Sequence, residues 1–272
     1  MSTEQEYFEI NRALWNEKTK HHTGSEFYDM EGWLKGVTSL KEPELALLGD
    51  VRGKDILHLQ CHFGQDSLSL ARMGARVTGT DISDEAIAYA QKLNDELKLD
   101  ARFVRSDTYA VPENVREQFD IVFASYGVIG WLPDMQRWAD VVAKMLKPGG
   151  WLVFVEFHPV VWMYDSGFSH IQYSYFNLAP IIENEQGTYA DRNADMQMEE
   201  IGWNHAMSDV LQSLINAGLS IEQVREYDYS PCNCFANTEQ VEPGKWQIKG
   251  IGGKIPMMYS LMAVKQLQAS IL

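Results

Sequence analysis

The stretch Asp55-Ile-Leu-His-Leu-Gln-Cys-His-Phe-Gly-Gln65 decides the fold, because a short apolar run ends there in a tight turn that leads into a helix-like pattern. A second apolar run, Val77-Thr-Gly-Thr80, ends at Asp81. Strand, turn, helix, strand and acid in this order are typical of a nucleotide-binding half-site. Backbone N–H groups at the turn suit an anion, and the acid suits ribose hydroxyls. The stretch therefore predicts an α/β fold that binds a nucleotide-like cofactor.

Strands and helices continue to alternate after Asp81. The apolar runs predict seven strands, at 55–60, 76–81, 101–105, 119–125, 151–156, 219–227 and 257–265. The connection between the last two contains no helix-length periodic segment, so we expect those strands to pair antiparallel. The fold class is thus α/β, with a doubly wound, mostly parallel sheet that carries helices on both faces. Ligands of such sheets bind beyond the carboxyl ends of the strands.

The composition excludes several classes of protein. A net charge of −15 over 272 residues argues against a nucleic-acid partner or an anionic membrane surface. The chain contains no apolar run of transmembrane length, and its first ten residues are polar and acidic, unlike a signal peptide. Three cysteines are too few for a disulfide framework. We therefore expect a cytoplasmic protein from a reducing compartment.

The ordered motifs resemble those of the class I S-adenosylmethionine-dependent methyltransferases over roughly residues 50–265. The matching segments are Ile56–Gln65, Val77–Asp81, Phe103–Asp107, Phe119–Ser125 and Leu146–Phe154, with similar closing strands. The resemblance implies a Rossmann-like, seven-stranded sheet whose last strand runs antiparallel, in agreement with the pattern of strands. It also implies S-adenosylmethionine as the methyl donor and S-adenosylhomocysteine as its product.

The first motif departs from the family pattern D-x-G-x-G-x-G. Its four defined positions hold His58, Gln60, His62 and Gly64, so only the last glycine is kept. Glycine lets the backbone approach a ligand closely. Gln60 and His62 therefore change the shape or contacts of the loop, and their side chains can hydrogen bond to the methionine moiety. The dinucleotide pattern G-x-G-x-x-G is absent, which disfavours a nicotinamide cofactor.

The resemblance assigns cofactor contacts residue by residue. Asp81 is expected to bind the ribose, with Ile82 and Ser83 flanking the adenosine. Asp107, with Thr108 beside it, is assigned to the adenine amino group. Gly64 and Gln65 open the helix whose N–H groups suit a carboxylate. The full set of expected cofactor contacts is Gln60, His62, Gly64, Gln65, Asp81, Ile82, Ser83, Asp107, Thr108 and Ser125.

Four residues are candidates for catalysis. Tyr126, at the strand end that faces the methyl group in the family, either hydrogen bonds a substrate atom or packs as a wall. Glu156 and His158 alternate along a strand and so point to the same side. They either take a proton from the acceptor or order the covering segment as a pair. His205, just before a helix, is another candidate base.

Two histidines in the N-terminal segment, His21 and His22, either close over the cofactor or pack within that segment. We expect no metal site. His58 and His62 lie on a strand and a loop, where a spacing of four has no ligand meaning, and Cys232 and Cys234 lack a zinc pattern.

Three parts of the chain have distinct expected roles. Residues 1–50 form an N-terminal helical cap, and residues 51–272 form the Rossmann-like methyltransferase domain. Within it, the aromatic-rich stretch 157–204 has no clear period. A long irregular insertion in a compact domain is usually functional or disordered, and aromatic content argues against disorder. We expect this insertion to cover the substrate as a lid.

The sequence thus predicts S-adenosylmethionine-dependent methyl transfer to a small-molecule acceptor, by a monomer or homodimer. Two alternatives stay open. One is a non-catalytic regulatory protein that binds the cofactor or its demethylated product. The other, disfavoured by the missing glycine pattern, is a nicotinamide-dependent oxidoreductase.

Overall fold

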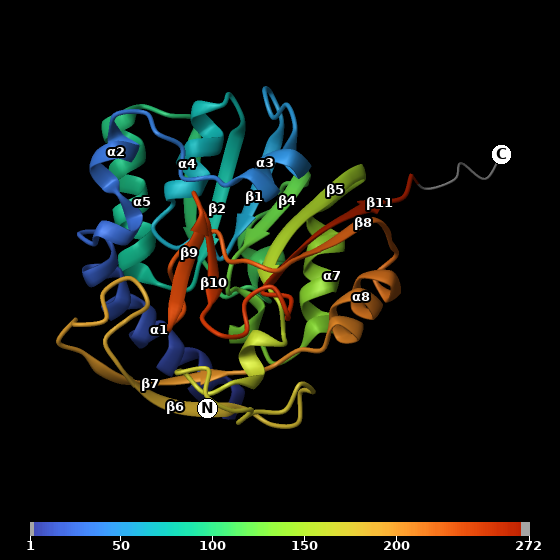
Figure 1. Ribbon diagram of the computed structural model, residues 1–272. Coiled ribbons are helices and arrows are strands. Elements are labelled where there is room, and N and C mark those ends of the chain that lie inside the picture. The colour runs from blue at the N-terminus through green and yellow to red at the C-terminus, as the bar shows by residue number, and fades with distance from the viewer. Residues whose placement is uncertain (1–2, 268–272) are drawn as a thin grey trace.

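The computed structural model describes residues 3–267 and contains a central seven-stranded sheet (Figure 1). Its strand order is β3-β2-β1-β4-β5-β11-β8. The strands of this sheet are β1 (Asp55–Leu59), β2 (Arg76–Asp81), β3 (Ala101–Arg105), β4 (Phe119–Ser125), β5 (Leu146–Phe157), β8 (Leu219–Tyr227) and β11 (Met258–Lys265). The helices are α1 (Thr3–His22), α2 (Met30–Leu34), α3 (Glu42–Leu48), α4 (Gln65–Arg72), α5 (Asp84–Leu97), α6 (Val111–Asn114), α7 (Met135–Met145) and α8 (Met207–Asn216). Three short 3₁₀ turns cover Glu26–Tyr28, Ile129–Trp131 and Val161–Met163.

The sheet confirms the predicted fold class. Strand β1 pairs parallel with β2 and β4, whereas β11 runs antiparallel to both β5 and β8. Successive residues of β1 face different cores: Ile56 packs with the cluster under α3 and α4, and Leu57 packs with the cluster under α7 and α8. Both faces of the sheet are therefore covered by helices, as in a doubly wound fold.

Side-chain caps fix where two of these helices begin. Ser83 lies just before α5, and its Oγ accepts a hydrogen bond from the N–H of Ala86. Asp134 caps α7 in the same way through the N–H of Arg137. Such caps typically stabilise a helix by about 1 kcal/mol. The predicted start of α5 at the carboxyl end of β2 is thus correct.

The insertion 157–204 is more regular than its sequence suggests. It contains an antiparallel hairpin of β6 (Ile181–Gln186) and β7 (Gln197–Gly202). In β6 the half-buried positions are Ile181, Glu183 and Glu185. Two of these inward-facing side chains are carboxylates, so the strand lacks the apolar alternation by which it would be recognised.

The hairpin lies against α1 at the end of the molecule where the carboxyl ends of the parallel strands lie (Figure 1). The side-chain amide of Asn11 donates to the carbonyl of Ile201 at 2.8 Å and accepts from its N–H at 3.0 Å. Lys18 forms a partly buried ion pair with Glu200 at 2.9 Å. A second hairpin, β9 (Thr238–Glu242) with β10 (Lys245–Ile248), follows β8. Within residues 3–267, no helix is long and apolar enough to cross a bilayer.

Candidate active site

A cavity of about 780 Å³ lies at the carboxyl ends of the parallel strands. The sheet side of its wall comprises Gln60, His62, Asp81, Asp107, Ser125 and Tyr126. The opposite side comes from α1 and the insertion, including Trp15, Glu185 and Tyr189. The expected cap and lid segments therefore contribute to the same wall as the strand ends.

Asp81 is a buried carboxylate at the end of β2. Its Oδ2 accepts the N–H of His62 at 2.8 Å, and its Oδ1 accepts the N–H of Ser83 at 2.9 Å. Burial raises the pKa of Asp81 to about 6, although these N–H groups lower it. Each carboxylate oxygen can accept a second hydrogen bond. Asp81 lines the cavity and thus retains capacity for a ligand hydroxyl.

The turn after β1 keeps a glycine-like backbone without the glycines. Gln60 has φ +53° and His62 has φ +50°, both in the left-handed region that favours glycine. Gly64, at φ +79°, has a further constraint, because a Cβ there would lie 2.7 Å from the Phe103 ring and 2.8 Å from Ala90. The absence of a side chain at Gly64 therefore lets the start of α4 lie close to Phe103 of β3. Gln60 and His62, in contrast, have side chains at positions where the family pattern has glycine.

The side chains of this turn leave buried polar atoms unused. Nε2 of His62 lies 2.9 Å from Nδ1 of His22, and the Gln60 amide donates to the carbonyl of Val128 at 2.7 Å. Burial lowers the pKa of His62 to about 3 and that of His22 to about 2, so both rings are neutral. Gln60 Oε1, His62 Nδ1 and His22 Nε2 are buried with no hydrogen-bond partner in residues 3–267. Such atoms call for a partner from a ligand or water.

Other expected cofactor residues are distributed along the same edge. Ile82, Asp107, Thr108, Gln65 and Ser125 line the cavity. Asp107 accepts the N–H groups of Tyr109 and Ala110 at 3.0 and 3.1 Å, which fixes the turn after β3. Ser83 is different: it is fully buried, caps α5 and donates to Asn16 at 2.7 Å, so its side chain is engaged away from the cavity.

Tyr126 and Glu44 form a pair at the cavity wall. The Tyr126 hydroxyl donates to Oε2 of Glu44 at 2.6 Å, and the N–H of Lys41 binds Oε1 at 2.7 Å. Tyr126 has φ +53°, a further left-handed residue at the site. Burial raises the pKa of Glu44 to about 7. The pair therefore combines a phenol with a carboxyl group that titrates near neutral pH.

Glu156, one of the expected catalytic residues, is buried and lies outside the cavity wall, so its catalytic role stays a prediction. Its carboxylate accepts the backbone N–H groups of Gly127, Val128, Ile129 and Phe157, the last at 2.6 Å. Burial raises its pKa, and these four donors partly offset the effect. The carboxylate turns toward the loop after β4, where it satisfies backbone N–H groups that would otherwise be unpaired. Glu156 shapes that loop.

His158 also lies outside the cavity wall. Its Nε2 is 2.9 Å from Glu226 of β8, and its Nδ1 accepts the N–H of Val160 at 3.2 Å. Desolvation lowers the pKa of His158, although Glu226 raises it. The expected Glu156–His158 pair is replaced by separate partners for each residue. Since Val160 begins the turn into the insertion, His158 orders the start of that segment.

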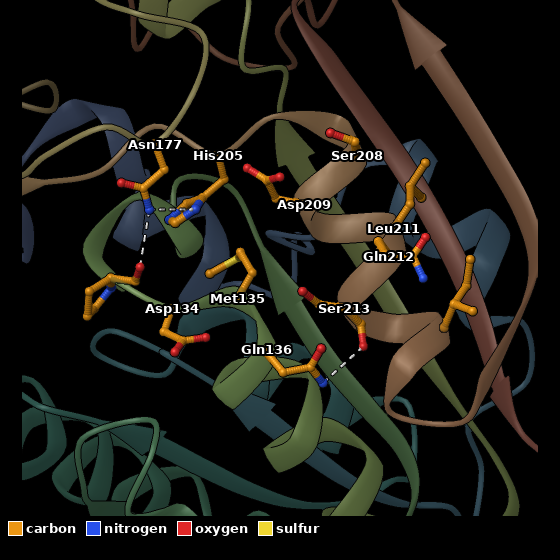
Figure 2. A pocket seen from close by; sticks show the side chains of 12 residues that line it. Asp134, Met135, Gln136, Asn177, His205, Ser208, Asp209, Leu211, Gln212 and Ser213 are labelled. Atoms are coloured by element: carbon orange, nitrogen blue, oxygen red, sulfur yellow. Dashed lines mark hydrogen bonds between the residues drawn. The ribbon is translucent and has the colours of Figure 1, made fainter.

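His205 lies in a different pocket, of about 620 Å³, beside the N-terminal ends of α7 and α8 (Figure 2). Its Nε2 is 2.7 Å from the carbonyl of Leu132, and Asn177 is 3.5 Å from its Nδ1. Figure 2 shows Asn177 and His205 side by side, with Asp209 on the adjoining helix. Sequence position before a helix could not reveal that His205 and the Asp81 edge open to different pockets.

Comparison with known proteins identifies the fold. Residues 57–152 match the family described as a methyltransferase domain. The structure superposes on an S-adenosylmethionine-dependent methyltransferase from Clostridium acetobutylicum with a TM-score of 0.57 at 15% identity, covering 95% of this chain and 99% of that one. The chain has the class I S-adenosylmethionine-dependent methyltransferase fold. The resemblance inferred from the ordered motifs is thereby confirmed.

Two further similarities agree with this fold. The DhpI–SAH complex structure superposes with a TM-score of 0.57 at 15% identity, covering 96% of this chain and 98% of that chain. A ubiquinone biosynthesis O-methyltransferase from Shewanella pealeana is 29% identical over 132 residues, which are 47% of this chain and 56% of the relative. The chain thus spans about half the length of the curated relatives it matches.

The methyltransferase fold here carries wall residues that sequence patterns did not indicate. Tyr28 and Tyr189, from the cap and the insertion, share a hydrogen bond of 2.5 Å between their hydroxyls. Lys18 lies 5.2 Å from the Trp15 ring centre and 5.1 Å from that of Trp131. Like Glu44, they come from segments that only tertiary structure brings to the sheet edge. Of the two cap histidines, His22 contacts the turn through His62, whereas His21 lies 3.7 Å from Glu17 on its own helix.

The two histidines of the first motif have different hydrogen-bond partners. Across residues 3–267, no group of three or more His, Cys, Asp or Glu side chains could hold an ion. Nδ1 of His58 is hydrogen-bonded to Oγ of Ser67 at 2.8 Å within the core. His62 is hydrogen-bonded to His22. The two histidines therefore have separate environments.

Proposed function

We propose that this protein is an enzyme that transfers a methyl group from S-adenosylmethionine to a small-molecule acceptor. The observation that carries the proposal is the buried Asp81 carboxylate, fixed by two backbone N–H groups and lining a cavity of about 780 Å³. A carboxylate held at the end of the second strand suits a pair of ribose hydroxyls. The fold and the methyltransferase-domain match support this function.

The residues present suit the cofactor at its other end too. Gly64 at the N-terminus of α4 provides no side-chain cap, and the first N–H groups of a helix suit a carboxylate. The unpartnered atoms of Gln60 and His62 lie beside this helix start and can hydrogen bond the same amino-acid moiety. Asp107 and Ile82 line the same cavity, and we assign them to the adenine. S-adenosylmethionine supplies an activated methyl group on a sulfonium sulfur.

The protein itself must position the acceptor and manage its proton. Trp15, Trp131 and Tyr189 provide aromatic walls that exclude water from the cavity. Tyr126 is the residue we assign to the acceptor, because its hydroxyl lies in the wall and is hydrogen-bonded to Glu44 behind it. With a pKa of about 7, Glu44 can accept a proton through Tyr126 from a hydroxyl, thiol or amine acceptor. Glu156 and His158 serve as positioning residues for the loops around the site.

Calorimetric titration of the purified protein with S-adenosylhomocysteine tests the cofactor assignment, with NAD as the comparison ligand. We expect saturable 1:1 binding of the nucleoside and no binding of NAD. Tight binding of NAD alone would overturn the proposal in favour of an oxidoreductase. A metabolite screen with a labelled methyl donor then separates an enzyme from a regulatory binding protein on the same fold, since only the enzyme transfers label. That the protein acts as a monomer or homodimer stays a prediction.

A further inference from the structure

Cys232 and Cys234 lie two positions apart in the cavity wall, on the segment between β8 and the β9–β10 hairpin. Both thiols are half-buried, in contrast to the buried Cys61. The backbone bends at Pro231–Asn233, and the sulfur atoms on either side of Asn233 both contact Ser230. A small molecule that enters the cavity thus meets a pair of thiols.

The hydroxyl group of Ser230 lies within hydrogen-bonding distance of both sulfur atoms. Its Oγ lies 3.4 Å from Sγ of Cys234 and 3.9 Å from Sγ of Cys232, and it donates to the carbonyl of Cys232 at 2.8 Å. Ser230 is itself fixed, because its backbone exchanges hydrogen bonds of 2.8 and 2.9 Å with Trp246 of β10. The two cysteines are separated by one residue and their sulfur atoms share the hydroxyl of Ser230, so a disulfide requires the two side chains to turn toward each other.

The two thiols differ chemically. A hydrogen bond from Cys234 lowers the pKa of Cys232, whereas burial, together with the same contact, raises that of Cys234. Burial also raises the pKa of Cys61. The thiolate is the nucleophile in thiol–disulfide exchange. Cys232 is thus placed to attack an oxidant, and Cys234 to resolve the product.

We propose that Cys232 and Cys234 form a redox-active dithiol that small-molecule disulfides, such as glutathione disulfide, oxidise reversibly. The Cys232 thiolate attacks one sulfur of the disulfide, forms a mixed disulfide and releases one thiolate. Cys234, losing its proton, then attacks the sulfur of Cys232 and releases the second thiol. The protein loses two protons and two electrons, and the small disulfide is reduced to two thiols. Excess reduced glutathione reverses both steps.

Oxidation at this place would act on the cavity wall. Arg192 of the insertion donates to the carbonyl of Phe235 at 2.7 Å, and the Phe235 ring packs 4.8 Å from that of Phe157 at the end of β5. A covalent ring closed between Cys232 and Cys234 shifts the start of this segment. The dithiol thus lies on a segment that contacts the insertion through Arg192 and Phe235. This inference does not require that the cavity bind a methyl donor.

Intact-mass spectrometry of the full chain, equilibrated in glutathione buffers of graded ratio and quenched with acid, tests the proposal. We expect the wild type to lose two hydrogen atoms without retaining glutathione, and fragmentation to place the link between Cys232 and Cys234. The C234S variant should instead accumulate glutathione on Cys232, because no resolving thiol remains. The C232S variant should react at least tenfold more slowly.

Near-identical thermal unfolding of both serine variants and the wild type provides the folding control. Three free thiols in the wild type at every buffer ratio, or adducts on Cys61 in place of the internal link, would overturn the proposal. If a variant fails to fold, the mass and fragmentation of the wild type alone show whether the Cys232–Cys234 disulfide forms. S-adenosylhomocysteine binding is measured separately, so failure of the methyl-donor assignment leaves this result unaffected.

Discussion

The hydroxyl of Tyr126 donates a 2.6 Å hydrogen bond to Glu44, joining the end of β4 to α3 across 82 residues of sequence. This contact places a carboxyl group with a pKa of about 7 behind the phenol that faces the cavity. In the folded protein Glu44 therefore holds its proton over a range where an unfolded glutamate has lost it.

Glu44 is expected to make stability fall as pH rises. Burial increases its pKa from the ordinary value of 4.5 to about 7 in the folded state. The native state binds the extra proton between these values, so the free energy of unfolding decreases across this window, by about 1.4 kcal/mol per pH unit for one such group. Urea titrations at pH 5 and 7 should show a smaller decrease for Glu44→Gln than for the wild type. If the free energy of unfolding decreased equally in the wild type and in Glu44→Gln, the pKa of Glu44 would not be elevated.

Asp81 should dominate cofactor affinity. Replacing it by Asn leaves one acceptor oxygen but sets an amide N–H₂ against the N–H groups of His62 or Ser83. We expect S-adenosylhomocysteine to bind at least about tenfold more weakly, a loss of about 1.4 kcal/mol. Calorimetry provides the measurement, and the exposed Asp100→Asn serves as the matched control. Unchanged affinity in Asp81→Asn would place the ribose elsewhere.

The left-handed backbone conformation of His62 should affect the free energy of unfolding of variants at this position. At φ +50°, alanine carries a conformational penalty that glycine does not. His62→Gly and His62→Ala remove the same contacts with Trp15 and His22. His62→Gly should therefore be the more stable of the two by about 1 kcal/mol in chemical denaturation. Both variants should bind S-adenosylhomocysteine more weakly. A more stable His62→Ala would contradict the strained turn.

Gly64 and Gly218 separate two reasons for glycine. Both have positive φ, +79° and +82°, but only at Gly64 does an added Cβ meet the Phe103 ring at 2.7 Å. Gly218→Ala thus measures the backbone penalty alone, about 1 kcal/mol. Gly64→Ala adds overpacking between α4 and β3, typically about 1–3 kcal/mol more. Thermal denaturation of the two variants gives the difference. Equal losses would mean that the packing around Gly64 yields without strain.

The fold was predictable from sequence because its signals are local. Apolar runs that end at Gln60 and Asp81, and a cap at Ser83, mark the β-α-β unit directly. The hairpin of β6 and β7 gave no such signal, since the inward positions of β6 include Glu183 and Glu185. Its inner face is the wall of a cavity, and a cavity wall does not follow the apolar pattern of a packed core.

The site was predictable only in part, and the reason is tertiary contact. Asp81, Asp107 and Tyr126 were found because strand ends meet at one edge of a parallel sheet. Glu44 and His22 reach that edge from helices outside the repeating unit, and no spacing in the sequence relates them to Tyr126 or His62. The backbone partners of Glu156 were not predictable, because alternation gives the face of a strand but not which backbone N–H groups lack a partner nearby.

The attachment of the β6–β7 hairpin to α1 through Asn11 and Lys18 divides the cavity wall between two structural units. One part of the wall comes from the strand ends of the parallel sheet. The other part comes from α1 and the β6–β7 hairpin, which are hydrogen-bonded to each other. Sequence change in the second half can thus reshape what the enclosure admits while the strand-end carboxylate of Asp81 keeps its place. Substitutions in α1 and the β6–β7 hairpin would therefore change which small molecules fit, while the strand ends of the parallel sheet stay the same.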